Sequence, residues 1–127
     1  MTTLGRFVMP YNVHASSNHM YGRGKRTFLH PEARNWRRLL TDQVRQWIEN
    51  HGIFIKPGHI VTISLTTHFP RERGGRGKGR KPDPSNFLKL AQDGIAAALK
   101  IDDHTFQVHA ILGPEDDLGY LVYQVEL

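Results

Sequence analysis

Alternating hydrophobic and polar residues predict most of the strands in this chain. In residues 60–69, the large apolar side chains share one face and the other face carries threonine, serine and histidine, as in a strand with one buried face. Residues 105–112 and 120–127 alternate in the same way and are separated by the acidic turn GPEDDLG, so we expect an antiparallel hairpin. The apolar run at residues 4–9 predicts a further strand, whereas the polar stretch PYNVHASSNHMYGRGKR predicts a loop.

Two segments have the spacing of amphipathic helices. From Pro31 onward, apolar residues recur at intervals of three and four, and Gly52 is expected to end this helix. The second helix follows Pro84, with Ser85 as the candidate N-cap, and continues to about Lys100. The order of these elements predicts a single α+β domain over residues 1–127, with a mostly antiparallel or mixed sheet and two helices packed on it.

The composition narrows the class of protein. A chain of 127 residues with 39% hydrophobic and 23% charged residues is typical of one soluble, folded domain. Without cysteine there is no disulfide and no thiolate metal site, so a metal would be bound by oxygen or imidazole. No apolar segment approaches the roughly 20 residues of a membrane span, and the N-terminal residues lack the apolar core of a signal peptide, so we expect a cytoplasmic protein.

The net charge of +5 is concentrated in one glycine-rich segment, RERGGRGKGRK, at residues 71–81. The remainder of the chain is neutral overall, so this segment predicts a local surface for a polyanion. Its basic residues are Arg71, Arg73, Arg76, Lys78, Arg80 and Lys81. The alternative is a solvated loop that only increases solubility.

Carboxylates suited to a hard cation lie at both ends of the segment KPDPSNFLKLAQDGIAAALKIDD. Asp83, Asp102 and Asp103 could hold magnesium, which binds oxygen ligands and lowers the pKa of a bound water. Lys89 could orient that water or neutralise charge on a phosphate. Each residue also has a purely structural explanation, because aspartates are common in turns and a helical lysine is commonly solvated.

This segment resembles the signature of the RusA-type Holliday junction resolvases, in which an Asp-x-Asp-Asn motif opens a lysine-bearing helix and an Asp-Asp pair follows it. The residues in register are Asp83, Asn86, Lys89, Asp93, Asp102 and Asp103. The earlier stretch SSNHMYGRGKRTFLHPEARNWRRLL is similar to the Ser-Asn-rich loop of that family, which leads into a helix through a short basic strand. The resemblance implies a homodimer that binds branched DNA in recombination or repair and nicks two strands symmetrically with Mg²⁺, with Mn²⁺ as a substitute. Such a small resolvase would suit a phage or prophage.

One position departs from the family pattern, because Ser85 stands where the second aspartate of the motif is expected. Serine is neutral, so the site has one carboxylate fewer. The chain could bind metal more weakly, require a different metal, or be a catalytically weakened protein that binds junctions without cutting them. A third interpretation is an RNA-binding or ribosome-associated module that uses the basic segment without a metal.

The length of the second helix raises a geometric question. A straight helix from residue 85 to about residue 100 would be roughly 22 Å long, which separates Asp83 from Asp102 and Asp103. Either the helix is shorter or bent near Gly94, or the site combines Asp83 of one subunit with the later pair of another. The composite site is our hypothesis.

Other polar residues offer phosphate contacts or metal ligands. Candidate DNA-binding residues outside the basic segment are Asn18, Tyr21, Arg23, Lys25, Arg26 and Asn86, although the loop that carries most of them could also be merely solvated. The eight histidines show no ligand spacing, and only His104, beside Asp103, is a candidate for a charged group near phosphate. The glycine-rich segment lacks the P-loop pattern, so no nucleotide cofactor is expected.

Overall fold

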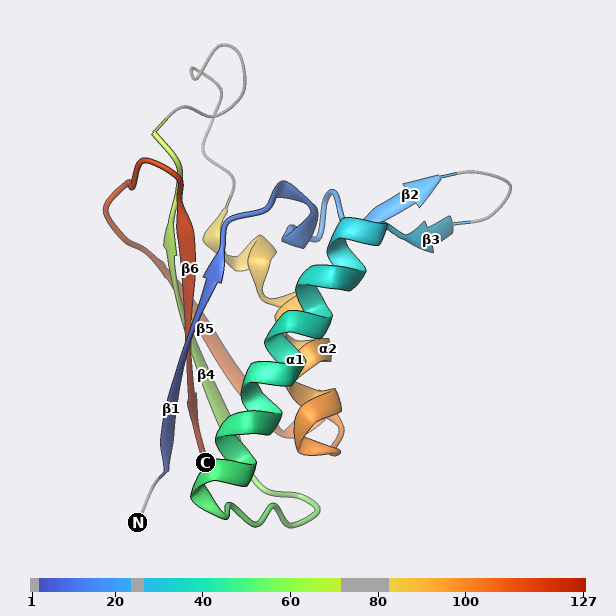
Figure 1. Ribbon diagram of the computed structural model, residues 1–127, viewed down its shortest axis with the longest axis vertical. Coiled ribbons are helices and arrows are strands. Elements are labelled where there is room, and N and C mark those ends of the chain that lie inside the picture. The colour runs from blue at the N-terminus through green and yellow to red at the C-terminus, as the bar shows by residue number, and fades with distance from the viewer. Residues whose placement is uncertain (1–2, 24–26, 72–82) are drawn as a thin grey trace.

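A computed structural model of the chain describes residues 3–23, 27–71 and 83–127, which form a four-stranded sheet with two helices on one face (Figure 1). The strands of this sheet are β1 (Leu4–Pro10), β4 (Val61–His68), β5 (Phe106–Leu112) and β6 (Tyr120–Glu126). The helices are α1 (Pro31–His51) and α2 (Lys89–Leu99). Three short 3-10 turns are η1 (Val13–Ala15), η2 (Pro84–Phe87) and η3 (Asp103–Thr105). The predicted α+β class and the mixed sheet with two helices are confirmed.

The sheet has the order β1-β6-β4-β5. β6 is antiparallel to both of its neighbours, and β5 is parallel to β4. The predicted hairpin of β5 and β6 is therefore wrong, because β4 lies between them. The sequence pattern identified both strands, but it carries no information on which strand pairs with which. A parallel pair needs a crossover, and α2 lies in the connection between β4 and β5.

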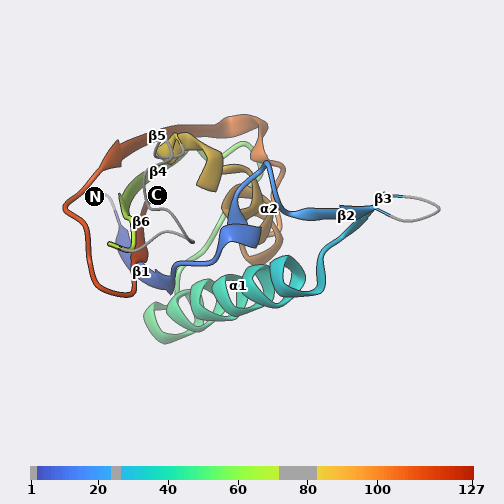
Figure 2. The same ribbon diagram turned by 90° about the horizontal axis from the view of Figure 1, so that it is seen from above.

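The stretch predicted as a loop before α1 contains two regular elements. η1 is followed by β2 (Tyr21–Arg23), which pairs with β3 (Thr27–Leu29) to form an arm that extends away from the sheet and helices (Figure 2). Gly22 permits this pairing, because a Cβ there would lie 2.5 Å from the ring of Phe28 on the opposite strand. Strands of three residues are too short to give a recognisable alternation, so periodicity did not predict them, although the family resemblance implied a short basic strand before the helix.

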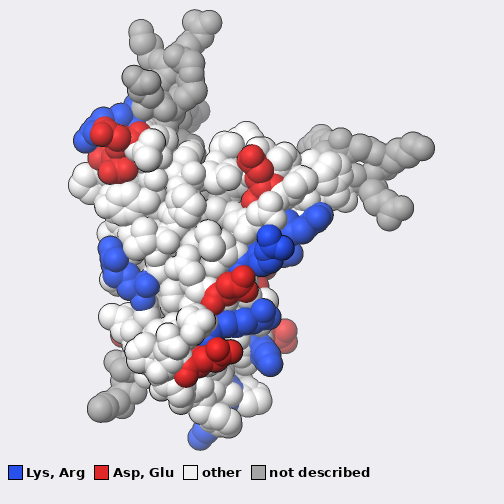
Figure 3. Space-filling model, in the orientation of Figure 1, with Lys and Arg blue, Asp and Glu red and all other residues white. Residues whose placement is uncertain are grey.

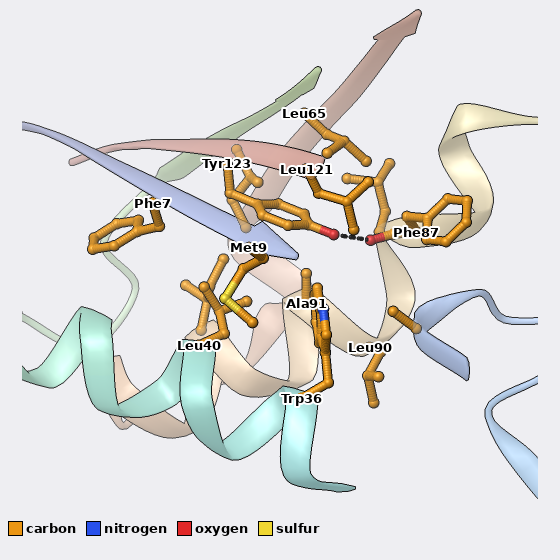
Figure 4. Close-up of a cluster of buried hydrophobic side chains, with 14 of the residues drawn as sticks. Phe7, Met9, Trp36, Leu40, Leu65, Phe87, Leu90, Ala91, Leu121 and Tyr123 are labelled. Atoms are coloured by element: carbon orange, nitrogen blue, oxygen red, sulfur yellow. Dashed lines mark hydrogen bonds between the residues drawn. The ribbon is translucent and has the colours of Figure 1, made fainter. Parts of the chain in front are cut away.

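The hydrophobic core lies between the sheet and the two helices (Figure 4). The predicted inner face of β4 and the predicted apolar face of the second helix are both buried, as expected. The large side chains at the centre include Met9, Trp36, Leu40, Leu65, Leu90 and Tyr123. Trp36 also donates from Nε1 to the carbonyl oxygen of Pro10 at 3.1 Å, which fixes α1 to the end of β1. The core thus sets the position of both helices relative to the sheet.

The two helices are in contact at Gly94 of α2. Thr41 of α1 is buried and donates its hydroxyl to the carbonyl oxygen of Gly94 at 2.9 Å. A Cβ at Gly94 would lie 3.1 Å from Cγ of Arg37 and 3.3 Å from its carbonyl oxygen. These distances are shorter than ordinary van der Waals contacts, so the absence of a Cβ at Gly94 favours the close approach of α2 to α1.

The exposed face of α1 carries charges of both signs in turn along the helix (Figure 3). Its exposed charged residues include Arg34, Arg38, Asp42, Arg45 and Glu49. Alternating signs do not build the continuous positive surface that a nucleic acid needs. Within the described ranges, neither helix combines the length and hydrophobicity that a membrane span requires.

Candidate active site

The turn η2, which follows Asp83, is anchored in the core by Phe87. The hydroxyl of Tyr123 in β6 donates to the carbonyl oxygen of Phe87 at 2.7 Å (Figure 4). Burial raises the pKa of Tyr123 well above its usual value, so this phenol stays protonated and can donate. The Phe87 ring packs edge-on against Phe69, with ring centroids 5.9 Å apart, and is tilted against the Tyr11 ring, with centroids 5.5 Å apart. The side chains on η2 are therefore presented from a rigid support.

Asp83 is the N-cap of η2. Its Oδ1 accepts hydrogen bonds from the backbone N–H of Ser85 and from the Ser85 hydroxyl, each at 2.9 Å. The prediction that Ser85 caps a long α-helix is wrong. Pro84 occupies the first position of a 3-10 turn, the carboxylate before it is the stronger cap, and α2 begins only at Lys89.

These two bonds control the charge of Asp83. The hydrogen bond from the Ser85 backbone, followed by the one from its hydroxyl, lowers the pKa of Asp83, and desolvation opposes this only in part. Asp83 is exposed and thus ionised at neutral pH. Because both bonds end on Oδ1, Oδ2 has no hydrogen-bond partner among the described residues. Within the described part of the chain, this oxygen is therefore available to a metal ion.

Lys89 links two of the predicted acidic residues. Its Nζ donates to Oδ1 of Asp93 at 3.1 Å and lies 4.0 Å from Oδ2 of Asp103. The hydrogen bond to Asp93 is the main cause of a raised Lys89 pKa, and the charges of Asp93 and Asp103 and the proximity of Tyr21 add to it. Lys89 is therefore a cation at neutral pH, suited to stabilise negative charge and unsuited to accept a proton.

The contact between Lys89 and Asp103 shows that the chain turns back along α2 after the helix ends. α2 has 11 residues, about 16 Å at 1.5 Å per residue, and it ends at Lys100 in the left-handed conformation. η3 then begins at Asp103, whose side chain returns to the face of the helix that carries Lys89. A shorter helix was one of the predicted solutions. The composite site between subunits stays a hypothesis.

The side chain of Asp102 lies near His104 and not near Lys89. Its Oδ2 lies 4.0 Å from Nδ1 of His104, and both side chains are largely exposed. The carboxylate beside His104 is thus that of Asp102, rather than that of Asp103 as the sequence suggested. Exposed pairs of this kind are weak, so His104 has no strongly fixed position.

The three predicted metal ligands fit magnesium in their chemistry but do not form a closed cage. Asp83, Asp102 and Asp103 supply only carboxylate oxygens, the donors that this hard ion prefers. They do not all lie within 4.8 Å of one another, a condition met within the described ranges by a different trio of side chains. Magnesium needs only one or two protein carboxylates when waters and a substrate phosphate complete its shell, so an open site is compatible with it.

An open cleft of about 570 Å³ lies beside the polar face of α2. Its polar lining includes Asp93, Lys100, Asp102, His104 and Thr105. Asp83 and Lys89 do not line it, so the cleft adjoins the acidic site on the side of Asp102 without enclosing it. Asp93 connects the two, because it lines the cleft and binds Lys89.

The loop before the arm lies against the same site. The backbone N–H of Ser17 donates to the carbonyl oxygen of Asn86 at 2.8 Å, which joins this loop to η2. Asn18, the next residue, is exposed. Tyr21 at the base of the arm is 52% exposed and lies near enough to Lys89 to influence its pKa. The surface around Lys89 is therefore bordered by Asn18, Tyr21 and Asn86, although Asn18 and Asn86 are 68 residues apart in the sequence.

The structure describes few of the predicted basic DNA contacts. Arg71 forms an ion pair with Asp117, and its backbone N–H donates to the carbonyl oxygen of Asp116 at 3.1 Å, so its charge is shared with the acidic turn. The backbone of Arg23 belongs to β2. The remaining predicted contacts lie outside the described residues and stay predictions: Lys25, Arg26, Arg73, Arg76, Lys78, Arg80 and Lys81.

Comparison with known proteins gives one family match. The family model described as Endodeoxyribonuclease RusA matches residues 10–112, which is most of the chain. The matched region includes the arm, both helices and every residue of the acidic site from Asp83 to Asp103. No curated protein matches the chain significantly.

Proposed function

Because the chain belongs to the RusA endodeoxyribonuclease family, we propose that it is a magnesium-dependent endonuclease that resolves four-way DNA junctions by paired nicking. The observation that carries this proposal is the geometry of Asp83. Its carboxylate is ionised, is oriented through one oxygen by Ser85, and has its second oxygen available to a metal. It stands on a turn that is fixed to the core by Tyr123.

The acidic residues would hold Mg²⁺, or Mn²⁺ in its place, through Asp83 together with Asp102 or Asp103. When bound, such an ion supplies a water of lowered pKa and neutralises charge on the phosphate. Lys89 contributes a fixed positive charge that stabilises the negative charge developing on the phosphate oxygens. Asp93 holds the Lys89 ammonium in place. Asn18 and Asn86 would position the DNA backbone through their amides.

We also propose that the functional unit is a homodimer. Two active sites related by a two-fold axis can address two opposed strands of a junction, which a single site cannot do at the same time. A dimer would also allow the composite site, in which the acidic residues of two subunits complete one another. Sedimentation analysis of the purified chain, with and without junction DNA, would measure the oligomeric state.

Ser85 supports a second candidate function, junction binding without cleavage. In place of a carboxylate, it provides a neutral hydroxyl that donates to Asp83. The site therefore has less negative charge with which to hold a cation. If this loss is decisive, the protein would bind a junction and leave it intact.

The test is cleavage of a labelled synthetic four-way junction in Mg²⁺, in Mn²⁺ and in chelator, with linear duplex as the control substrate. Paired symmetric nicks that are lost in chelator and in Asp83→Asn would support the resolvase. Tight junction binding without nicks under either metal would support the second function. Binding that is indifferent to branching, and insensitive to Asp83→Asn, would point to the RNA-binding module.

The basic segment should supply affinity rather than turnover. Neutralising Arg73, Arg76, Lys78, Arg80 and Lys81 should weaken junction binding and reduce the slope of log K against log salt, because fewer counterions are released. The rate of cleavage at saturating protein should change little. A salt dependence equal to that of the unaltered chain would contradict a phosphate-binding role for this segment.

A further inference from the structure

Three potential metal ligands meet at the base of the β2–β3 arm, away from the aspartates of the proposed active site. His14 belongs to η1, His30 lies between β3 and α1, and Glu32 is in the first turn of α1. One ligand atom from each lies within 4.8 Å of the other two. The imidazole rings of His14 and His30 are stacked, with centroids 3.7 Å apart and an interplanar angle of 9°.

The hydrogen bonds of His14 determine which of its nitrogens is available. Nδ1 lies 3.0 Å from the carbonyl oxygen of His19, which can only accept, so Nδ1 carries a proton. Nε2 lies 3.4 Å from Oε2 of Glu32. In a neutral ring the lone pair of Nε2 faces this carboxylate, and a metal ion placed between the two atoms would bind both. A histidine whose other nitrogen donates to a backbone carbonyl is also the usual form of a metal ligand.

His30 would change its interactions on binding a metal. Its Nδ1 accepts a hydrogen bond from the backbone N–H of Glu32 at 3.1 Å and thereby caps α1. Lone pairs of imidazole lie in the ring plane, so two stacked rings cannot both direct a nitrogen at one ion. His30 must therefore tilt from the stack to bind the ion, and binding through Nδ1 would also release the cap. The coordinate bonds formed replace one hydrogen bond and one ring contact.

We propose that His14, His30 and Glu32 bind one transition-metal ion of the zinc type, with a water as the fourth ligand. Two imidazoles and one carboxylate favour such an ion over magnesium, which prefers oxygen alone. The positive end of the α1 dipole and the nearby Arg34 disfavour a cation here, and the charge of Glu32 offsets them.

The role of this ion is structural. His14 precedes the arm and His30 follows it, so one ion bound to both closes the base of the arm across residues 15–29. Tyr21, at the start of β2, lies beside Lys89. The ion would thus fix the orientation of the arm relative to the surface that borders the acidic site.

Zinc affinity of the full chain tests this site without DNA, so its result is independent of nuclease activity. Zn²⁺ would be titrated against a chromogenic chelator in excess Mg²⁺, which occupies the carboxylate site. The variants His14→Asn and His30→Asn remove a ligand but conserve local structure, because asparagine can donate near the position of Nδ1 and is a good N-cap. His19→Asn is the matched control, since only the backbone carbonyl of His19 takes part.

We expect one Zn²⁺ per chain and a loss of affinity of at least about tenfold in each ligand variant, with His19→Asn unchanged. Co²⁺ bound to the unaltered chain should show the visible absorption of a four-coordinate ion. Equal zinc affinity in the unaltered chain and in a His14→Asn, His30→Asn double variant would overturn the site.

The structural role needs a separate measurement, which is amide hydrogen exchange in β2 and β3. Zinc should slow exchange in the unaltered chain and leave exchange in His14→Asn as it was. If zinc binds with the expected stoichiometry and the arm exchanges at the same rate, the ion does not close the arm and that role is excluded.

Discussion

The two helices end in the same backbone conformation but differ in how they are built and in what they carry. α1 ends at Gly52 with φ 58°, and α2 ends at Lys100 with φ 60°. α1 is long and regular, and its exposed face has charges of both signs. α2 is short, lies between two 3-10 turns and carries Lys89 and Asp93. The regular helix supports the core, and the interrupted one brings acidic and basic groups together.

The largest expected effect is the difference in cleavage rate between two variants, one that loses a carboxylate before α2 and one that loses a carboxylate on α1. Asp83→Asn removes a charged metal ligand and should lower the cleavage rate by at least about 100-fold, while junction binding is retained. Asp42→Asn, on the exposed face of α1, removes the same charge from a surface that has no part in the site and should leave the rate unchanged. Single-turnover cleavage of a four-way junction measures both. Equal losses in the two variants would contradict a specific role for Asp83.

The anchor of η2 should have the next largest effect. Tyr123→Phe leaves the buried carbonyl of Phe87 without its donor, which should lower the free energy of unfolding by about 1–3 kcal/mol. Tyr120→Phe is the control, because the stacking of this ring on His68 is retained. Chemical denaturation of the three proteins gives the comparison. A Tyr123→Phe variant as stable as Tyr120→Phe would show that the hydrogen bond does not hold η2.

The two helix ends offer a matched pair of backbone substitutions. Gly52→Ala should destabilise the fold by about 1 kcal/mol, because a left-handed residue with a Cβ is strained and no neighbour within 4 Å compensates. Lys100→Gly should stabilise it by a similar amount for the opposite reason. Thermal or urea unfolding measures both changes. If both substitutions changed the free energy of unfolding in the same direction, the left-handed conformation would not be the property that determines stability at the two helix ends.

The smallest effect should come from the hydroxyl of Ser85. This hydroxyl is one of the groups that lower the pKa of Asp83, so Ser85→Ala should raise that pKa towards its usual value. Cleavage needs the ionised carboxylate, and the acid limb of kcat/KM should therefore move to higher pH. Ser85→Thr keeps the hydroxyl and should keep the profile. If the acid limb were identical in all three proteins, the hydrogen bond from the Ser85 hydroxyl would not control the pKa of Asp83.

The sequence predicted which residues are buried and which face of a helix is apolar. It did not predict which strands pair or which side chain caps the second helical segment. The inner face of β4 and the apolar face of the second helix followed from periodicity alone. The hairpin of β5 and β6 was wrong, because the parallel pairing of β5 depends on a crossover that no local pattern encodes. The cap was assigned to Ser85 because serine and aspartate are both good caps, and only the 3-10 turn distinguishes them.

The residues of the candidate site were identified through family resemblance, and their contacts needed the fold. Asp103 meets Lys89 only because η3 turns the chain back along α2. His14 and His30 gave no sign of a ligand pair in the sequence, since the spacing between them is that of the whole arm. Spacing in the sequence reveals ligands that are a few residues apart. It does not reveal ligands that a hairpin brings together from distant positions.

The position of β6 in the middle of the sheet has a consequence for synthesis on the ribosome. β6 pairs with both β1 and β4, and it carries Tyr123, yet it is translated after the whole acidic site. A nascent chain that stops short of Tyr123 has every candidate catalytic residue but lacks both the central strand of the sheet and the donor that anchors η2. The candidate site can therefore reach the described geometry only after β6 has been synthesised and has joined the sheet.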